Sequence, residues 1–287
     1  MNEGADIAVE EQKDFGLDAE GWAKRYKIEI SLYEDDSRDW KRQCAQILKR
    51  YLNRYSISEA AADTGADVRT ARVNILWSNV QTLQPSLYSR TPKPEVDRKH
   101  KDKDDIGRTA AQILERALVI VLQNDWVDPM FKQIRDDYIL CGRGIGRVRY
   151  IPTFDDAQEK LVNEEVKFEY VHRNDFGYGP GRTWEEVQIV WFKSYLTRDE
   201  LIERFGEELG RKVGLTYSDK KYEEALEKEG GTLPQPTFQK GVVYEIWDKA
   251  RGVVSWLSPG YDQILDEQPD PLNLDGFFPC PRPLFGT

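Results

Sequence analysis

The stretch that decides the fold is "IRDDYILCGRGIGRVRY", from Ile134 to Tyr150. Its first part continues a helical pattern that starts at Asp128, the expected N-cap, with Pro129 at the first helical position. Its last part alternates apolar and charged residues, as a half-buried strand does. Glycines stand at positions 142, 144 and 146 between the two patterns. We therefore predict a helix, then a close-packed glycine joint, then a strand.

The order of these elements bears on whether the glycines bind phosphate. A dinucleotide-binding loop follows a strand and opens a helix, so that the phosphate oxygens meet the helix N-terminus. Here the glycines follow a helix, whose C-terminal dipole disfavours anions. The chain also lacks the Gly-Lys-Ser or Gly-Lys-Thr of a P-loop. We interpret the glycines as a structural joint, and we expect no nucleotide or other cofactor.

The sequence before the joint predicts three further helices. Apolar residues repeat every three or four positions from Ser37, the expected N-cap, to residue 55, and again over about 67–84 and 105–124. Pro85 is expected to end or kink the second of these helices. The third carries Ile106, Ala110, Ile113, Ala117 and Val121 along one face. Residues 1 to about 30 show no clear period, so we expect a loosely ordered arm there.

After the joint, the apolar period changes from helical to alternating. Strands are predicted around "GRVRYIP", "VKFEYV" and "VQIVWFKSYLT", and a hairpin at "VVYEIWDKARGVVSWL". Thr197 and Glu200 fit a capping box that starts a short helix over 198–205, which Gly206 should end. Five prolines after position 268 predict an extended tail without a regular element.

These patterns predict an α+β fold in which a helical N-terminal half packs on a β-rich C-terminal half. We divide the chain into an arm (1–36), a helical part (37–145), a β-rich part (146–260) and a proline-rich tail (261–287).

Composition limits the classes of function. The 287 residues carry a net charge of −10, which disfavours a basic DNA-reading face. There is no run of about 18 apolar residues, so we expect no membrane partner. Cys44, Cys141 and Cys280 are odd in number and far apart, which indicates buried thiols. The two histidines show no ligand spacing, so we expect no metal site.

Two groups of basic residues are candidate contact sites. The first lies in a charged connector and comprises Arg98, Lys99, Lys101 and Lys103. Interleaved aspartates cancel much of its field, so a solvated connector is the simpler interpretation and DNA contact the alternative. The second group follows the joint and comprises Arg143, Arg147 and Arg149. We expect these arginines to pair with acids within one chain or between chains.

A magnesium-dependent nuclease site is an alternative interpretation of the region after the joint. Such sites combine an Asp at a strand end with Glu-x-Lys on the next strand, where the acids hold the metal and the lysine steadies the attacking water. Asp155 or Asp156, followed by Glu165 and Lys167, fits this pattern. Glu-x-Lys also arises by chance in a chain that is 32% charged, in which case these residues form the wet face of a hairpin.

Several stretches, taken in order, resemble the portal proteins of tailed double-stranded DNA bacteriophages, particularly the short-tailed type. They are "NILWSNVQTLQPSLYSRTPKPEV" (74–96), "GRTAAQILERAL" (107–118), "IRDDYILCGRGIGRVRY" (134–150), "VHRNDFGYGPGRTWEEVQIVWFKSYLTRDELIERFG" (171–206), "VYEIWDKARGVVSWLSPG" (243–260) and "DPLNLDGFFPCPRPL" (270–284). The resemblance lies in the joint order of these landmarks and not in one active-site signature.

The resemblance implies a structural, non-enzymatic protein of the virion. Portal subunits form a ring, usually of twelve, that serves as the head–tail connector at one capsid vertex. The ring assembles with capsid and scaffolding proteins, docks the terminase motor, passes DNA without sequence specificity during packaging and ejection, and holds tail or adaptor proteins. The expected location is the virion, and the host cytoplasm during assembly.

Within that family, this sequence resembles the wing domain. The stem and clip that follow the wing in portal proteins would lie beyond Thr287, so we expect the full-length subunit to continue. In a ring of this kind, we expect a charge reversal at Arg147 to impair assembly more than folding of the monomer. The alternatives to a portal subunit are the nuclease above and another ring or adaptor protein of the virion.

Overall fold

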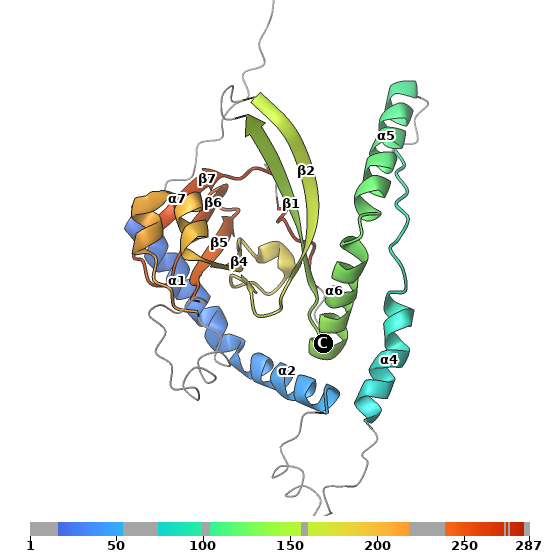
Figure 1. The fold of residues 1–287 in the computed structure, drawn as a ribbon, viewed down its shortest axis with the longest axis horizontal. Coiled ribbons are helices and arrows are strands. Elements are labelled where there is room, and N and C mark those ends of the chain that lie inside the picture. The colour runs from blue at the N-terminus through green and yellow to red at the C-terminus, as the bar shows by residue number, and fades with distance from the viewer. Residues whose placement is uncertain are drawn as a thin grey trace, which may run out of the picture. The chain divides into compact units, whose positions relative to one another are not determined.

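The computed structural model describes residues 17–53, 74–98, 104–155, 160–217, 239–272, 274 and 276–283. Helices occupy the N-terminal half and antiparallel sheets the C-terminal half, which confirms the α+β prediction (Figure 1). The chain divides into two compact units. Unit 1 comprises residues 1–37 and 175–278, and unit 2 comprises residues 38–174 and 279–287.

These units differ from the division expected from the sequence. Residues 146–174 were expected in the β-rich part but belong to unit 2 with the helices, whereas the tail up to Phe278 belongs to unit 1. The reason is that the first two strands form a sheet of their own, and the second of them packs on the helix before the joint. The expected boundaries at 146 and 261 therefore differ from those of the units, whereas the one at 36 falls one residue from the unit boundary at 37.

Unit 1 is a five-stranded antiparallel sheet in which each strand pairs with the next along the chain. Its strands are β3 (Phe176–Tyr178), β4 (Ile189–Leu196), β5 (Gly241–Asp248), β6 (Val253–Leu257) and β7 (Ile264–Pro269). Two helices, α1 (Ala19–Asp36) and α7 (Arg198–Lys212), and the 3-10 turn η1 (Trp184–Glu186) complete the described part of the unit.

The two faces of this sheet carry separate apolar clusters. Trp191 and Ile246 are cross-strand partners on the face that packs against α1. Val243 lies three residues from Ile246 on the same strand, so its side chain points to the opposite face, where it packs with Leu201 of α7. Gly177 pairs with Trp191, and a Cβ at Gly177 would lie 2.4 Å from the indole. The missing side chain therefore makes room for the tryptophan.

Helix α1 corrects the expectation of a loosely ordered arm over 1–36. The Asp18 side chain caps the helix by accepting a 2.8 Å hydrogen bond from the backbone N–H of Gly21. Trp22, Tyr26 and Ile30 lie four residues apart and are all buried in the cluster on the sheet. This buried stripe holds the helix, while residues 1–16 lie outside the described part of the chain.

Ser37 was predicted to cap the start of the next helix, and α2 does begin directly after it, but its hydrogen bonds run back to α1. The Ser37 N–H donates to the Tyr33 carbonyl at 2.9 Å, and the Ser37 hydroxyl donates to the Glu34 carbonyl at 3.4 Å. Ser37 therefore satisfies carbonyls at the end of α1.

Helix α7 confirms the predicted capping box. The Glu200 N–H donates to the Thr197 hydroxyl at 3.4 Å, and the Thr197 N–H donates to the Glu200 carboxylate at 2.7 Å. Gly206 interrupts the helix with a φ of +83°, as a glycine can, but helical residues resume after it and continue to Lys212. The predicted stop is therefore a kink, and the helix is longer than 198–205.

Strand β7 corrects the expectation that residues 261–287 contain no regular element. It pairs with β6, and Pro269, opposite Val253, is its last residue. β7 is one of the two edge strands of the sheet, and an edge strand tolerates proline because one side of its backbone needs no partner.

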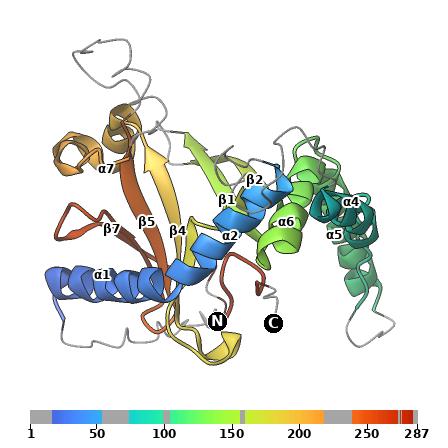
Figure 2. The same ribbon diagram turned by 90° about the horizontal axis from the view of Figure 1, so that it is seen from below.

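Unit 2 contains four helices and a two-stranded hairpin among its described residues. The helices are α2 (Arg38–Tyr51), α4 (Ile75–Leu87), α5 (Asp105–Leu122) and α6 (Val127–Cys141), and the strands are β1 (Ile145–Asp155) and β2 (Lys160–Val171) (Figure 2). The predicted helices over 37–55, 67–84 and 105–124 correspond to α2, α4 and α5, although residues 54–73 lie outside the described part. Pro85 falls in the last turn of α4, which ends two residues later.

Cys44, Val80 and Leu140 form the small core of unit 2, one from each of α2, α4 and α6. Cys44, Cys141 and Cys280 are buried free thiols, as predicted. Helix α6 starts one residue before Asp128, which lies inside the helix, so the predicted Asp128 cap is wrong.

The glycine joint is confirmed at the end of α6. Gly142 caps the helix in the left-handed conformation, with a φ of +73°, and its N–H donates to the Tyr138 carbonyl at 2.9 Å. A Cβ at Gly144 would lie 2.3 Å from the Ile134 carbonyl oxygen. Only glycine allows this close passage, and β1 begins at Ile145.

Candidate assembly surface

Helix α5 carries a continuous row of apolar side chains that faces solvent. The row consists of Ile106, Ala110, Ile113, Ala117 and Ile120, which we call the α5 seam. Its isoleucines recur every seven residues and are 80%, 63% and 67% exposed. No residue of α5 is buried among the described residues. A helix with an apolar stripe of this spacing ordinarily packs against another element along that stripe.

The opposite face of α5 is occupied by the chain segment that precedes it. The Val96 N–H donates to the Glu115 carboxylate at 3.3 Å, and Arg98 Nη1 donates to the Asp104 carbonyl at 2.7 Å. Glu115 lies two residues from Ile113, about 200° around the helix axis. The connector therefore holds one side of α5 and leaves the seam on the other.

Helix α4 also exposes apolar side chains while packing through one buried residue. Val80 is buried with Cys44 and Leu140. Four other large apolar side chains of α4 are exposed, namely Ile75, Trp77, Leu83 and Leu87. Trp77 is 51% exposed, so it is not part of the core of unit 2.

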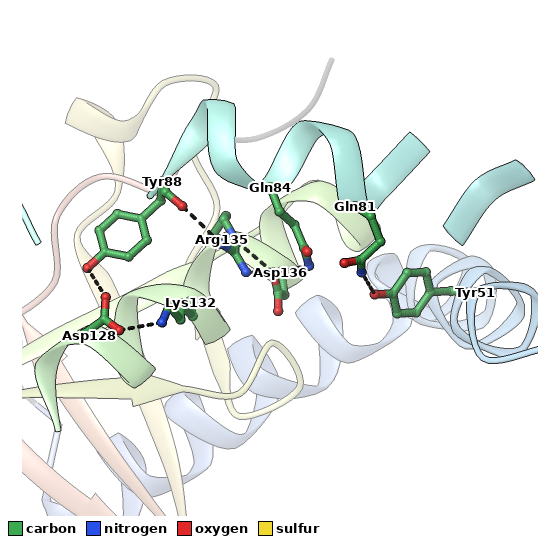
Figure 3. Close-up of polar contacts among 8 residues, drawn as sticks. All are labelled: Tyr51, Gln81, Gln84, Tyr88, Asp128, Lys132, Arg135 and Asp136. Carbon is green, nitrogen blue, oxygen red and sulfur yellow. Dashed lines mark hydrogen bonds and ion pairs between the residues drawn. The ribbon is translucent and has the colours of Figure 1, made fainter. Parts of the chain in front are cut away.

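Polar contacts fix α4 on α2 and α6 (Figure 3). Gln81 Nε2 donates to the Tyr51 hydroxyl at 3.1 Å, and Gln84 Nε2 donates to the Asp136 carboxylate at 2.9 Å. The Asp136 carboxylate also accepts from the Arg135 guanidinium at 2.8 Å. These bonds fix the rotation of α4 relative to α2 and α6.

The C-terminal end of α4 is held by a second set of bonds visible in Figure 3. Arg135 Nη1 donates to the Tyr88 carbonyl at 3.1 Å, and the Tyr88 hydroxyl donates to the Asp128 carboxylate at 3.0 Å. Lys132 pairs with Asp128 at 2.6 Å and lowers its pKa, whereas burial raises the pKa of Tyr88. All these groups bond to one another, so the cluster is structural and positions the chain that leads to α5.

The β1–β2 hairpin presents a third exposed apolar face. Its base packs on α6, where the Asp137 carboxylate accepts from the Tyr170 hydroxyl at 2.6 Å and from Arg173 at 2.7 Å. Farther from the joint, Tyr150 and Val166 are cross-strand partners on one face and both are exposed. In Figure 1 the outer half of the hairpin extends past α6. The outer half therefore has no covering layer among the described residues of unit 2.

The arginines after the joint are placed differently from one another. Arg143 and Arg147 are 8% and 7% exposed, and the Arg143 guanidinium lies 4.1 Å from the centre of the Trp40 ring. Arg147 lies near Cys280, whose pKa burial raises to about 12 against the opposing effect of the arginine. Neither side chain is available to a neighbouring chain. The burial of Arg147 counts against the expectation that a charge reversal there impairs assembly more than folding.

Arg149 is the exposed member of this group. It pairs with Glu169 on the adjacent strand at 3.5 Å, an acid of the same chain, as expected. In the connector, the Arg98 backbone N–H donates to Asp97 at 2.8 Å and its guanidinium holds the Asp104 carbonyl. Lys99, Lys101 and Lys103 lie outside the described residues.

The described acidic residues of the nuclease hypothesis do not lie close enough together to form a metal site. Glu165 pairs with Ile151, and Asp155 lies four positions farther along β1, opposite Lys160. Four residues of strand span about 13 Å, too far for Asp155 and Glu165 to share one metal ion. Asp156 lies outside the described residues.

The described residues offer neither a metal-binding cluster nor a membrane-spanning helix. They contain no group of three or more His, Cys, Asp or Glu placed to hold a metal ion. None of the helices in this part of the chain is long and apolar enough to cross a membrane.

Comparison with protein-family models and with curated protein sequences finds no match to this chain. The candidate surface therefore rests on its own geometry. The sequence contained the α5 seam as a helical period, and the structure adds that nothing described covers it.

Proposed function

We propose that this chain is the wing region of a phage portal subunit, a structural component of the ring through which double-stranded DNA enters and leaves the capsid. The observation that carries the proposal is the α5 seam, whose three isoleucines are at least 63% exposed along a helix that is otherwise well formed. Such a surface is costly to a solitary chain and is typical of one that associates with a partner.

The portal assignment adds to this surface the ordered set of portal-like stretches that runs from residue 74 to the end of the chain. The net charge of −10 also fits a conduit. A protein that passes DNA lengthwise cannot hold many phosphates at once, because each phosphate contact strengthens binding at ordinary salt concentration. The motor, tail, capsid and scaffolding proteins are the further partners that this function requires, and the virion vertex is its location.

Ring formation tests the proposal directly. Mass photometry and negative-stain electron microscopy of the full-length gene product should show closed rings, with about twelve subunits in each. A protein that stays monomeric across concentration and salt would contradict the portal function. Open chains or two-fold dimers would instead favour another kind of assembly protein.

A further inference from the structure

Two different elements of unit 2 carry unpartnered apolar faces. The first is the α5 seam defined above. The second, which we call the outer hairpin face, consists of Val148, Tyr150, Leu161 and Val166. The register places all four on one side of the ribbon, because Tyr150 pairs with Val166, Val148 pairs with Phe168, and Leu161 pairs with Phe154. A two-stranded ribbon without a covering layer is marginally stable in water, so this face calls for a partner.

The size of these faces indicates what can cover them. The α5 seam exposes roughly 500 Å² and the outer hairpin face roughly 300 Å², each within the size range of the largest apolar patch on an ordinary monomer. A standard protein–protein interface covers about 800 Å² on each partner, with an apolar centre and a polar rim. One face meeting the other would form a centre of the right size for a single interface.

Symmetry decides which face meets which. If two seams met, the contact would be two-fold and would close at a dimer. A ring requires two different patches on each subunit, one for each neighbour. The seam and the outer hairpin face are two such patches. Opposite charges also stand beside the two patches. Arg116 is exposed beside the seam, where Asp105 already pairs with Arg108 at 2.9 Å. Glu164, which bonds to Tyr150, lies on the hairpin face.

We infer that the α5 seam of one copy packs on the outer hairpin face of the next copy. The inference rests on the proposed ring and names the surfaces that build it. A helix laid on a twisted two-stranded ribbon supplies the missing second layer to both elements, and it covers the isoleucines and the hairpin side chains together.

Cysteine cross-linking between two variants tests this contact. Ile113→Cys and Val166→Cys chains, distinguished by tags of different mass, are mixed in equal amounts and treated with a short bis-maleimide. We expect a cross-linked species containing one chain of each kind. Each chain carries a single introduced cysteine, so a cross-link within one chain cannot give this product. The native cysteines are buried, and the unsubstituted chain measures their background.

Matched controls lie next to each position. Gln112→Cys is exposed on α5 beside the seam, and Glu165→Cys is exposed on the other side of the hairpin from Val166. Mixtures that contain a control variant should cross-link at least tenfold less. Equal cross-linking by the controls, or no cross-link in any mixture, would overturn the inference, and so would a cross-link formed by Ile113→Cys alone, because that product is a two-fold pair.

Electron microscopy of the uncrosslinked full-length protein separates this inference from the proposed function. Rings without the mixed cross-link leave the portal function standing and remove the proposed contact. The mixed cross-link in open filaments supports the contact and removes the closed ring.

Discussion

The two units of this chain differ in how far they cover their apolar side chains. In unit 1, Trp191 is 2% exposed between α1 and the sheet, and α7 covers the other face. In unit 2, Trp77 is 51% exposed and α5 buries nothing. Both faces of the unit 1 sheet are thus covered within one chain, although Ile28, Leu32 and Phe277 are exposed, whereas unit 2 leaves helix and hairpin faces uncovered. The exposed faces of unit 2 suit it to contact other chains, whereas the covered sheet of unit 1 suits it to a structural role within one chain.

The largest expected effect is a difference in stability loss between a tryptophan of unit 1 and one of unit 2. Trp191→Ala should lower the free energy of unfolding by about 3–5 kcal/mol, because it empties a fully enclosed site in the sheet core. Trp77→Ala, the same change on exposed α4, should cost about 0.5 kcal/mol or less in the monomer. Urea unfolding of both variants, followed by circular dichroism at a concentration where the chain is monomeric, makes the measurement.

Similar losses for the two tryptophans would show that the α4 surface is covered within the monomer. The premise that unit 2 exposes these apolar side chains in the monomer would then be wrong.

A second pair of variants sharpens the comparison within unit 2. Arg147→Glu should destabilise the monomer by about 3 kcal/mol, because it reverses a charge at a site that is 7% exposed. Arg149→Glu, two residues along the same strand but largely in solvent, loses one cross-strand ion pair worth about 1 kcal/mol or less. Thermal unfolding of the two variants side by side gives the difference.

Equal stability of the two arginine variants would contradict the buried placement of Arg147. It would also restore the expectation that this residue acts between chains.

The parts of the fold that could be predicted from the sequence are those with local causes. Thr197 and Glu200 lie three residues apart, so their capping box is readable in the chain itself. Gly142 stands where a helix pattern stops, and the joint follows from that position. In both cases the residues that determine the structure are neighbours in sequence.

The parts that were missed depend on distant partners. The stripe of Trp22, Tyr26 and Ile30 was present in the sequence, but charged residues between its members obscured it, and the sheet that buries it lies more than 150 residues away. β7 was missed because prolines argued against a strand. Its pairing with β6, however, needs hydrogen-bonding groups on only one side of its backbone. The α5 seam was visible as a period, but a period does not tell what covers it.

The smallest expected effect concerns pH and the buried polar groups of unit 1. Asp248 is 2% exposed, and its carboxylate accepts a 2.9 Å hydrogen bond from the Tyr26 hydroxyl. Burial raises the pKa of Asp248 above its ordinary 3.8, outweighing the hydrogen bond from Tyr26 and the charge of Arg251. The stabilisation from this group is therefore complete below the ordinary pKa and is lost as pH rises through the higher folded pKa.

Asp248→Asn removes this ionisation, so the two proteins should diverge over one pH window. The free energy of unfolding of the Asn variant, relative to that of the parent, should rise from about pH 4 upward and level off once Asp248 is ionised in the folded parent. Urea titrations at a series of pH values give this difference without requiring either absolute value. Tyr26→Phe takes away a bond that lowers the Asp248 pKa, so it should move the window to higher pH. A difference that falls with pH would mean that the folded chain favours the Asp248 carboxylate. In that case the charged Asp248 carboxylate would stabilise the contact between α1 and the sheet, and apolar burial would contribute a smaller share of that stability.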